Sequence, residues 1–319
     1  MPKKATVTQL RRHEKYERLV AATRDLRPLA TAVAHPCDEV SLRGALEAAE
    51  EGIITPVLVG PKIRICELAK SLDVNINGID IVDVPADQSA AKAVEVIRTG
   101  KAELLMKGSL HSDELLAAVA KRDTGLRTGR RISHVFVMDV PNHPQTLFIT
   151  DAAVNIAPDL LAKRDIVQNA IDFYVGVGLG APKVAILSAV ETVNPGIPST
   201  IDAAALCKMA ERGQITGGEL DGPLAFDNAI SPEAARVKGI KSPVAGQAQI
   251  LVVPNLEAGN MLAKNLSFLS GADAAGVVLG ARVPIILTSR ADNVRTRMAS
   301  CAVAMLFAYS QMAKEPIRA

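Results

Sequence analysis

The sequence predicts an α/β protein of two α/β/α domains, each with a mostly parallel sheet. Two observations lead to this prediction. Short apolar runs of strand length alternate with stretches of helical spacing along most of the chain, which is typical of parallel strands covered by helices on both faces. The chain has 319 residues, 49% hydrophobic and 22% charged, and this length and composition suit two packed domains of ordinary size.

The first domain is expected to consist of four strand and helix pairs. The apolar runs expected to form strands are residues 29–34, 55–59, 79–84 and 103–106. The stretches with helical spacing are residues 39–51, 62–72, 89–99 and 112–121. Asp38 and Ser112 occupy positions typical of helix starts, and the charge-rich stretch 3–18 is expected to begin a solvated helix.

A change of pattern marks the boundary between the domains. Two β-rich runs, 132–140 and 146–150, are joined by the turn Pro141-Asn-His-Pro144, which predicts a hairpin or an edge pair. We place the domain exchange at Asp151, so that residues 1–150 form the first domain and residues 151–292 the second. Further helices are expected at 163–174, 199–211 and 293–312, and further strands at 183–187, 249–253, 276–279 and 284–287.

Composition and charge exclude several classes of partner. The net charge of +2 comes from 36 basic and 34 acidic residues, so no overall positive field favours nucleic acid or anionic lipid. Aromatic residues make up 3% of the chain and tryptophan is absent, which disfavours a surface for stacking bases. No apolar run reaches the roughly 18 residues of a membrane helix and no signal peptide is recognisable, so a cytoplasmic protein is expected. The four cysteines and five histidines are scattered, and no metal site is expected.

The most informative segment is the end of the apolar run 284–287. It leads directly into Thr288, Ser289, Arg290 and Asp292. In open α/β sheets ligands bind at the carboxyl ends of strands, where the next helix also directs its free amides. The guanidinium of Arg290 has planar donors suited to a phosphoryl oxygen or a developing oxyanion, although a salt bridge between domains is the alternative.

Asp292 has two interpretations, a helix cap or a general base. As a cap it would contribute about 1 kcal/mol. As a base it would accept a proton from a substrate group, yet for a group as weakly acidic as a thiol the ordinary pKa values of about 3.9 for Asp and 8.5 for the thiol oppose the transfer by about 6 kcal/mol. Burial would have to raise the carboxyl pKa, or a cation such as Arg290 would have to stabilise the thiolate.

Two other strand ends carry similar polar clusters. Lys107, Gly108, Ser109 and His111 follow the expected strand 103–106, and their amides and the lysine suit a phosphate group, with an ordinary βα turn as the alternative. The strand 249–253 leads into Asn255, Asn260 and Lys264. Asn255 is also a candidate helix cap, and Gly259 with Asn260 suits close approach by a ligand or by the other domain.

The segments 220–227, 250–260 and 284–292, in this order, resemble the phosphate acyltransferases, the family of phosphate acetyl- and butyryltransferases. The resemblance covers nearly the whole chain. It implies transfer of a short acyl group between coenzyme A and inorganic phosphate, with Ser289 and Arg290 in the active site and no tightly bound cofactor. It also implies a homodimer, an interdomain cleft, an architecture like that of isocitrate and isopropylmalate dehydrogenases, and a last helix, about 293–319, that folds back on the first domain.

The chain departs from the acetyltransferase pattern at two positions. The family aspartate six residues after the arginine is Thr296 here, and the run Ser-Arg-Ala-Asp instead resembles the butyryltransferase branch. The family arginine seven residues after the histidine is Ala118. Arg127 and Arg130 match a Leu-Arg-Thr-Gly stretch of the butyryltransferase branch and are expected to supply the missing charge, unless they are ordinary exposed loop residues.

The expected activity is that of a phosphate acetyltransferase in which the coenzyme A thiolate attacks acyl phosphate directly. Such a reaction needs no enzyme nucleophile, in agreement with the absence of a Ser-His or Cys-His arrangement. A butyryltransferase is the first alternative. A metal- and NAD(P)-dependent hydroxyacid dehydrogenase would need a carboxylate cluster that the sequence lacks, and a non-catalytic acyl-CoA-binding module would show no turnover. Asp151 and Asn155 match a family signature and are assigned either to hydrogen bonding at the domain hinge or to ligand contact.

Overall fold

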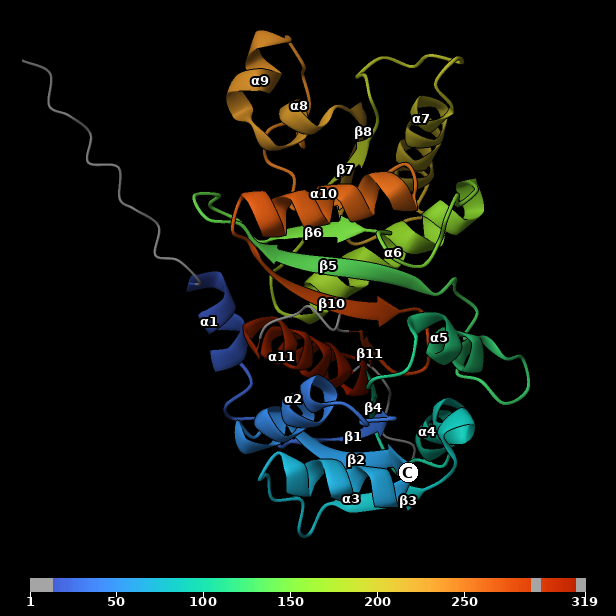
Figure 1. Cartoon of the computed structure of the whole chain (residues 1–319). Helices are drawn as coiled ribbons and strands as arrows, with labels where there is room; N and C mark the ends of the chain where they lie inside the picture. Colours follow the sequence, from blue (N-terminus) through green and yellow to red (C-terminus); the bar gives the residue numbers. More distant parts are fainter. Residues whose placement is uncertain (1–13, 288–293, 314–319) are drawn as a thin grey trace, which may run out of the picture.

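The computed structural model describes residues 14–287 and 294–313. A sheet of eleven strands runs through these residues in the order β3-β2-β1-β4-β11-β10-β5-β6-β9-β7-β8 (Figure 1). Seven of its ten strand pairs are parallel within the described chain, and the three antiparallel pairs lie together at the centre. The predicted mostly parallel α/β fold is therefore confirmed. The division into domains at Asp151 stays a prediction, because the strand ladder is continuous across that position.

The first wing of the sheet contains the four strands expected there. They are β1 (Leu29–Ala34), β2 (Ile54–Gly60), β3 (Asp80–Asp83) and β4 (Leu104–Lys107). The helices that follow them are α2 (Glu39–Glu50), α3 (Lys62–Ser71), α4 (Ser89–Arg98), preceded by the short turn η1 (Ala86–Gln88), and α5 (Ser112–Ala120). Each expected element is present to within one residue at either end. Asp38 caps α2 by accepting a hydrogen bond from the Ser41 amide, as its position predicted.

The centre of the sheet reverses the direction of the strands. The strands β5 (Ser133–Asp139) and β6 (Leu147–Thr150) form the predicted antiparallel hairpin. The strand β10 (Asp273–Leu279) runs antiparallel to both β5 and β11 (Ile285–Ile286), and β11 is parallel to β4. As a result, β11 continues the first wing although it comes last in the sequence.

The second wing contains elements that the sequence reasoning missed. Its strands are β7 (Lys183–Leu187), β8 (Glu219–Leu224) and β9 (Ile250–Val252). Its helices are α6 (Leu160–Gly176), α7 (Pro198–Glu211), α8 (Phe226–Ile230), α9 (Pro232–Val237) and α10 (Leu256–Leu269). The strand β8 was not predicted because Gly222 and Pro223 argue against a strand interior. Its place at the edge of the sheet explains why they are tolerated, since an edge strand has hydrogen-bonding groups that need no partner strand.

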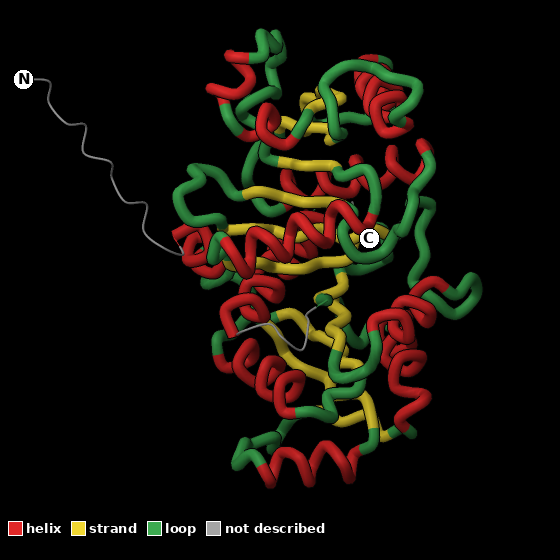
Figure 2. The backbone as a smooth tube through the Cα atoms, turned by 45° about the horizontal axis from the view of Figure 1, so that its top comes forward, coloured by secondary structure: helices red, strands yellow, loops and turns green. Residues whose placement is uncertain are grey.

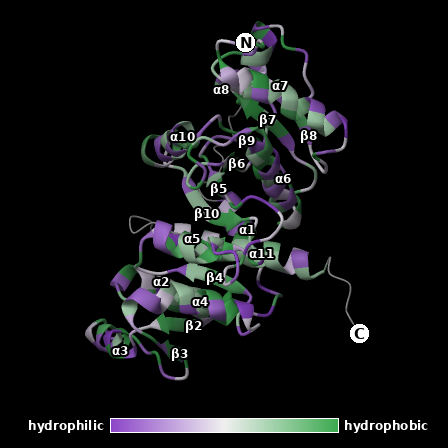
Figure 3. Cartoon of the chain, turned by 90° about the vertical axis from the view of Figure 1, so that its right-hand side faces the viewer, coloured by the Kyte–Doolittle hydropathy of each residue, from purple (hydrophilic) through white to green (hydrophobic). Residues whose placement is uncertain are grey.

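Helices cover both faces of the sheet (Figure 2), and the last helix contacts distant parts of the chain. The helix α11 (Val294–Met312) is buried along much of its length. Its Arg297 lies 3.7 Å from the carboxylate of Glu47 on α2, and its Phe307 ring packs edge-on against Phe173 of α6. The helix α1 (Glu14–Ala21) contacts the hairpin turn, where Lys15 pairs with Asp139 at 2.9 Å. Hydrophobic residues are concentrated in the strands and on the helix faces against them (Figure 3).

None of the described helices is both long and apolar enough to cross a membrane.

Candidate active site

The turn after β4 is held tightly against the turn after β1. The amide of Gly108 donates to Ala34 O at 2.9 Å, and the amide and hydroxyl of Ser109 donate to His35 O at 2.9 and 2.8 Å. A Cβ at residue 108 would lie 2.3 Å from Ala34 O, so only glycine permits this approach. The predicted group Lys107, Gly108 and Ser109 therefore sits at the carboxyl edge of the first wing, with Lys107 buried there.

A pocket of about 570 Å³ opens at this edge. We call it the carboxyl-edge pocket, and it is lined by His35, Cys37, Asp38, Arg64, Ala86, Asp87, Ser109, Leu110, His111 and Glu114. Ser109 and His111, which the sequence predicts to bind a ligand, both line this pocket, and so do His35 and Arg64, which the sequence reasoning did not select. The signal for His35 was present, because it directly follows an apolar strand just as Gly108 follows β4.

Burial and the charge of Arg64 shift the pKa values of two groups in the carboxyl-edge pocket. Desolvation lowers the pKa of His35, and the nearby Arg64 guanidinium lowers it further. Burial raises the pKa of the Cys37 thiol, so this cysteine is kept in its unreactive protonated form. Arg64 lines the pocket, and its charge acts on both groups.

The turn after β6 forms a closed hydrogen-bond network. The Asp151 carboxylate, which is 3% exposed, accepts hydrogen bonds from the amides of Ala153 and Val154, each at 3.0 Å. Asn155 donates to Asp151, and its Oδ1 accepts from Arg131 Nε at 2.8 Å. The described contacts of Asp151 and Asn155 thus correspond to the first of their two predicted roles, hydrogen bonding that fixes the backbone.

The side chains of Asn255 and Asn260, after β9, also have hydrogen-bond partners within the protein. Asn255 Oδ1 accepts from the Ala258 amide at 2.9 Å, which is the capping role foreseen for it. Asn260 Nδ2 donates to Ala152 O at 3.3 Å, and a Cβ on Gly259 would lie 3.0 Å from Ala152 Cα. The close approach at residue 259 is one between α10 and the turn after β6, so its partner lies in the same predicted domain and is neither of the two that were predicted. Lys264 is exposed one turn further along α10.

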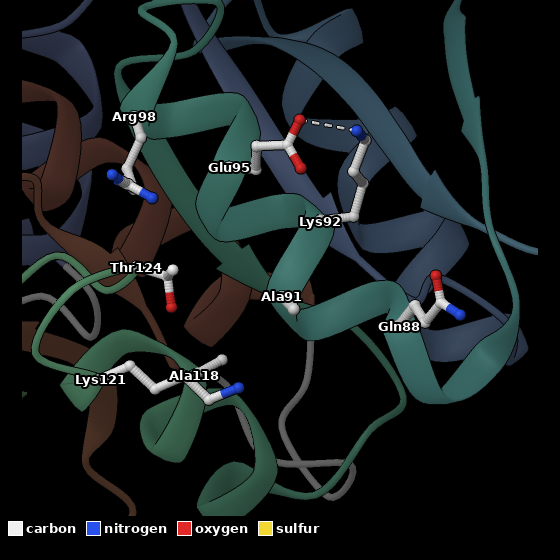
Figure 4. Close-up of a pocket in the computed structure, with 8 residues that line it drawn as sticks. All are labelled: Gln88, Ala91, Lys92, Glu95, Arg98, Ala118, Lys121 and Thr124. Atoms are coloured by element: carbon white, nitrogen blue, oxygen red, sulfur yellow. Dashed lines mark hydrogen bonds and ion pairs between the residues drawn. The ribbon is translucent and has the colours of Figure 1, made fainter.

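Arg127 and Arg130 lie away from the carboxyl-edge pocket. They line a separate hollow of about 410 Å³ beside the start of α6, together with Arg131 and Arg164. The Arg130 guanidinium pairs with Asp172 at 2.5 Å. The position of Ala118 lies instead in a groove of about 270 Å³ between α4 and α5, next to Arg98 and Lys121 (Figure 4). The expectation that Arg127 or Arg130 replaces the family arginine stays a prediction.

Apolar residues next to three of the predicted segments share one hydrophobic cluster. Leu110 after β4, Val154 after β6 and Leu287 after β11 belong to the same hydrophobic cluster, which also contains Val278 of β10. Thr288, Ser289, Arg290 and Asp292 lie outside the described residues, between Leu287 and the start of α11. Because β11 is parallel to β4, the chain leaves β11 at the same edge as the turn that begins with Lys107.

The central strand β5 carries a histidine that the sequence reasoning did not select. His134 is 1% exposed, and its Nδ1 has no hydrogen-bond partner among the described residues. Burial lowers its pKa to about 4, so the imidazole is neutral at pH 7. A Cβ on Gly276 would lie 3.0 Å from its Nε2 and 2.8 Å from Leu287 O, which places the imidazole close to the end of β11. The sequence did not indicate a functional role for it, because it is a single histidine within an apolar strand.

Within the described parts of the chain, no three His, Cys, Asp or Glu side chains are grouped so that they could hold a metal ion.

The sequence is similar to known proteins along most of its length. Residues 84–305 match the model of the family described as phosphate acetyl/butaryl transferase. A phosphate acetyltransferase of Rhizobium meliloti is 70% identical, with 94% of this chain and 96% of the relative covered. A phosphate butyryltransferase of Clostridium acetobutylicum is 42% identical, with 90% and 95% covered. Among solved structures, a branched-chain phosphotransacylase from Enterococcus faecalis V583 has a TM-score of 0.76 and 29% identity, with 88% and 99% covered.

Proposed function

The chain belongs to the phosphate acetyl/butaryl transferase family, and we infer that it is an acyltransferase that moves an acetyl group reversibly between coenzyme A and inorganic phosphate. The observation that carries this inference is the 70% identity to a phosphate acetyltransferase over nearly the whole chain. The butyryltransferase relative is 42% identical. Acetyl is therefore the acyl group that we assign.

The proposed reaction is a direct transfer. The thiolate of coenzyme A attacks the carbonyl carbon of acetyl phosphate, a C–S bond forms, and the C–O bond to phosphate breaks as phosphate leaves with its electron pair. The thiol proton must leave before or during attack. Catalysis then consists mainly of aligning two anionic substrates and stabilising the oxyanion.

We assign the reacting centre to the carboxyl edge shared by β4 and β11. Arg290 would stabilise the thiolate and the oxyanion, with Ser289 and Thr288 as hydrogen-bond donors and Asp292 as the base or the residue that orients the thiol. Lys107 and the first amides of α5 would hold the phosphoryl group. Two observations support the second assignment: His111 at the start of α5 provides no side-chain cap, and Lys107 is a buried cation at the same turn.

The remaining proposals concern architecture and surroundings. We propose two domains with the active site in the cleft between them. The second domain would contribute one wall of this cleft, with Asn255, Asn260 and Lys264. A homodimer is supported by the exposed apolar side chains of Met261, Phe268 and Leu269 on α10. A cytoplasmic location is supported by the four cysteines, all of which are free thiols.

A comparison of acyl donors tests the proposed function. The enzyme would be assayed for thiol consumption with coenzyme A and acetyl, propionyl or butyryl phosphate under matched conditions. We expect the largest kcat/KM with acetyl phosphate. A larger value with butyryl phosphate would transfer the assignment to the butyryltransferase branch, to which the run Ser-Arg-Ala-Asp already points.

A further inference from the structure

His134 lies at the centre of the sheet, between the two wings. It is on β5 and stands opposite Val278 of β10 in the strand ladder (Figure 1). Val278 belongs to the hydrophobic cluster that also contains Leu110, Val154 and Leu287, which follow β4, β6 and β11. Side chains directly opposite each other in a ladder lie on the same face of a sheet. His134 is therefore on the face where the turns after these three strands converge.

The imidazole of His134 is buried without hydrogen bonds from the described chain. The residue is 1% exposed, and its Nδ1 has no hydrogen-bond partner among the described residues. Thr150 donates to its backbone oxygen at 2.8 Å, but no hydrogen bond within the described part of the chain reaches either ring nitrogen. Buried polar atoms in proteins are normally paired, and an exception calls for an explanation such as a bound molecule. The ring therefore has hydrogen-bonding capacity that a substrate would use.

The contacts around Gly276 show which ring nitrogen faces the end of β11. A Cβ added to Gly276 would lie 3.0 Å from Nε2 of His134 and 2.8 Å from Leu287 O. The amide of Leu287 donates to Gly276 O at 3.2 Å. The imidazole therefore packs on the backbone where the β10–β11 pair ends, and only glycine leaves room for it. Phe136 contacts the same ring edge-on, with ring centroids 4.4 Å apart, which restricts the orientation of the imidazole.

The neutral state of His134 limits what it can do in the reaction. Burial lowers its pKa to about 4, and the nearby Asp151 carboxylate opposes this shift only in part. The ordinary pKa of a thiol is about 8.5, so such an imidazole is a weaker base than a thiolate by on the order of 10⁴-fold and does not deprotonate coenzyme A. A neutral imidazole still has one N–H donor, and a donor of this kind polarises a carbonyl group without carrying a charge.

We propose that His134 is a catalytic residue, which donates a hydrogen bond from Nε2 to the carbonyl oxygen of the acyl group. This inference rests on the proposed function, which supplies acetyl phosphate as the substrate. As the thiolate adds to the carbonyl carbon, negative charge develops on the carbonyl oxygen and its hydrogen bond to His134 strengthens. When the C–O bond to phosphate breaks, phosphate leaves with the electron pair and the C=O bond forms again. The proton stays on Nε2 throughout.

Replacement of His134 by phenylalanine separates catalysis from packing, because phenylalanine keeps an aromatic ring and removes both ring nitrogens. With coenzyme A and acetyl phosphate, we expect kcat of His134→Phe to fall about 10²-fold, as for the loss of one oxyanion donor, while the KM for coenzyme A changes little. The midpoint of urea unfolding at pH 7 should not decrease, because a buried polar atom without a partner is removed. Wild-type kcat in this variant would overturn the proposal.

A second pair of variants tests the donor directly and does not depend on whether the phenylalanine ring fits. The side chain of His134→Gln keeps an N–H donor, whereas that of His134→Leu has none. We expect kcat to be at least about tenfold higher in His134→Gln than in His134→Leu. Equal kcat in these two proteins would contradict the role of His134 as a donor.

His143→Phe is the matched control. His143 also has a buried ring nitrogen without a partner in the described chain and a pKa lowered by burial, but it lies in the hairpin turn, where its backbone oxygen accepts from Lys15 at 2.7 Å. This variant should keep the wild-type kcat, and a loss as large as in His134→Phe would overturn the proposal. A wild-type protein that forms no acetyl-CoA would refute the proposed function and this role with it. An active wild type beside an equally active His134→Phe would refute the role alone.

Discussion

In two regions of the molecule polar side chains follow buried strands. The two regions differ in how many hydrogen bonds the protein itself makes to these side chains. At the ends of β1 and β4, His35 and His111 line a pocket, and Nε2 of His35 receives no hydrogen bond from the described residues. At the ends of β6 and β9, Asp151 and Asn255 direct their oxygens to nearby backbone amides. A polar side chain after a buried strand therefore predicts a position at the sheet edge. Whether it binds a ligand depends on how much of its hydrogen-bonding capacity the protein itself uses.

The largest effect should come from the arginine that follows β11. If Arg290 stabilises the thiolate and oxyanion, Arg290→Lys should lower kcat by about 10²-fold, because the planar donors are lost while the charge remains, and Arg290→Ala should lower it further. Steady-state kinetics would be measured beside thermal unfolding, with Arg282→Lys as a control at an exposed arginine between β10 and β11. If the Arg290→Lys protein folds normally and keeps the wild-type kcat, Arg290 forms a salt bridge and has no role in catalysis.

The turn after β6 should respond in stability rather than in catalysis. Asp151→Ala removes the acceptor of two part-buried amides and of the buried backbone and side-chain amides of Asn155, so the free energy of unfolding should fall by about 3 kcal/mol. Asp151→Asn keeps one oxygen acceptor and should lose less. Denaturant unfolding measures both variants. Full stability of Asp151→Ala would show that the network does not hold the turn.

His134 should make the protein sensitive to acid. Its folded pKa of about 4 lies below the ordinary value of 6.5, so the unfolded chain binds the proton first as the pH falls. Stability should therefore decrease between about pH 6.5 and pH 4, and the contribution of this group is on the order of 3 kcal/mol. His134→Gln should abolish this part of the decrease.

The measurement is the free energy of unfolding of both proteins at several pH values in this range. His35 and His143, whose pKa values are also lowered by burial, keep their contributions in both proteins and cancel in the difference. Parallel stability curves for the wild type and His134→Gln would mean that protonation of His134 is not coupled to unfolding.

The smallest effect is expected at Asn255. As a helix cap, it should cost about 1 kcal/mol of stability when replaced by alanine, and almost nothing when replaced by aspartate, which caps equally well. The kcat of Asn255→Asp should stay near the wild-type value if capping is its only role. A selective loss of kcat in that variant would place Asn255 at the substrate, as the sequence first suggested.

The sequence predicted the fold well wherever local signals and tertiary structure agreed. The elements of the first wing follow directly from alternating apolar runs and helix starts such as Asp38. The strand β8 could not be predicted because Gly222 and Pro223 contradict the local pattern, and only the edge position makes them acceptable. The pairing of β11 with β4 joins residues about 180 positions apart, and no local pattern contains that information.

The candidate site was predicted in part for a similar reason. Ser109 and His111 were selected because they form a compact polar run after a strand, and both line the carboxyl-edge pocket. Arg64 gave no signal, since a lone arginine in the first turn of a helix is usually a solvated residue. His35 gave only the signal of a single polar residue after an apolar strand. Its assignment depends on the distant Ser89, which only the folded chain brings within hydrogen-bonding distance.

The most direct test of the account is an acyl transfer measurement with the wild-type protein. Purified enzyme would be mixed with coenzyme A and acetyl phosphate in a buffer that contains a chelator of divalent metals and no nicotinamide, and acetyl-CoA and phosphate would both be quantified. The account predicts that the two products form in equal amounts and that the reaction reverses when phosphate and acetyl-CoA are supplied. Reduction of NAD(P) with a hydroxyacid in the absence of any acetyl-CoA formation would contradict it.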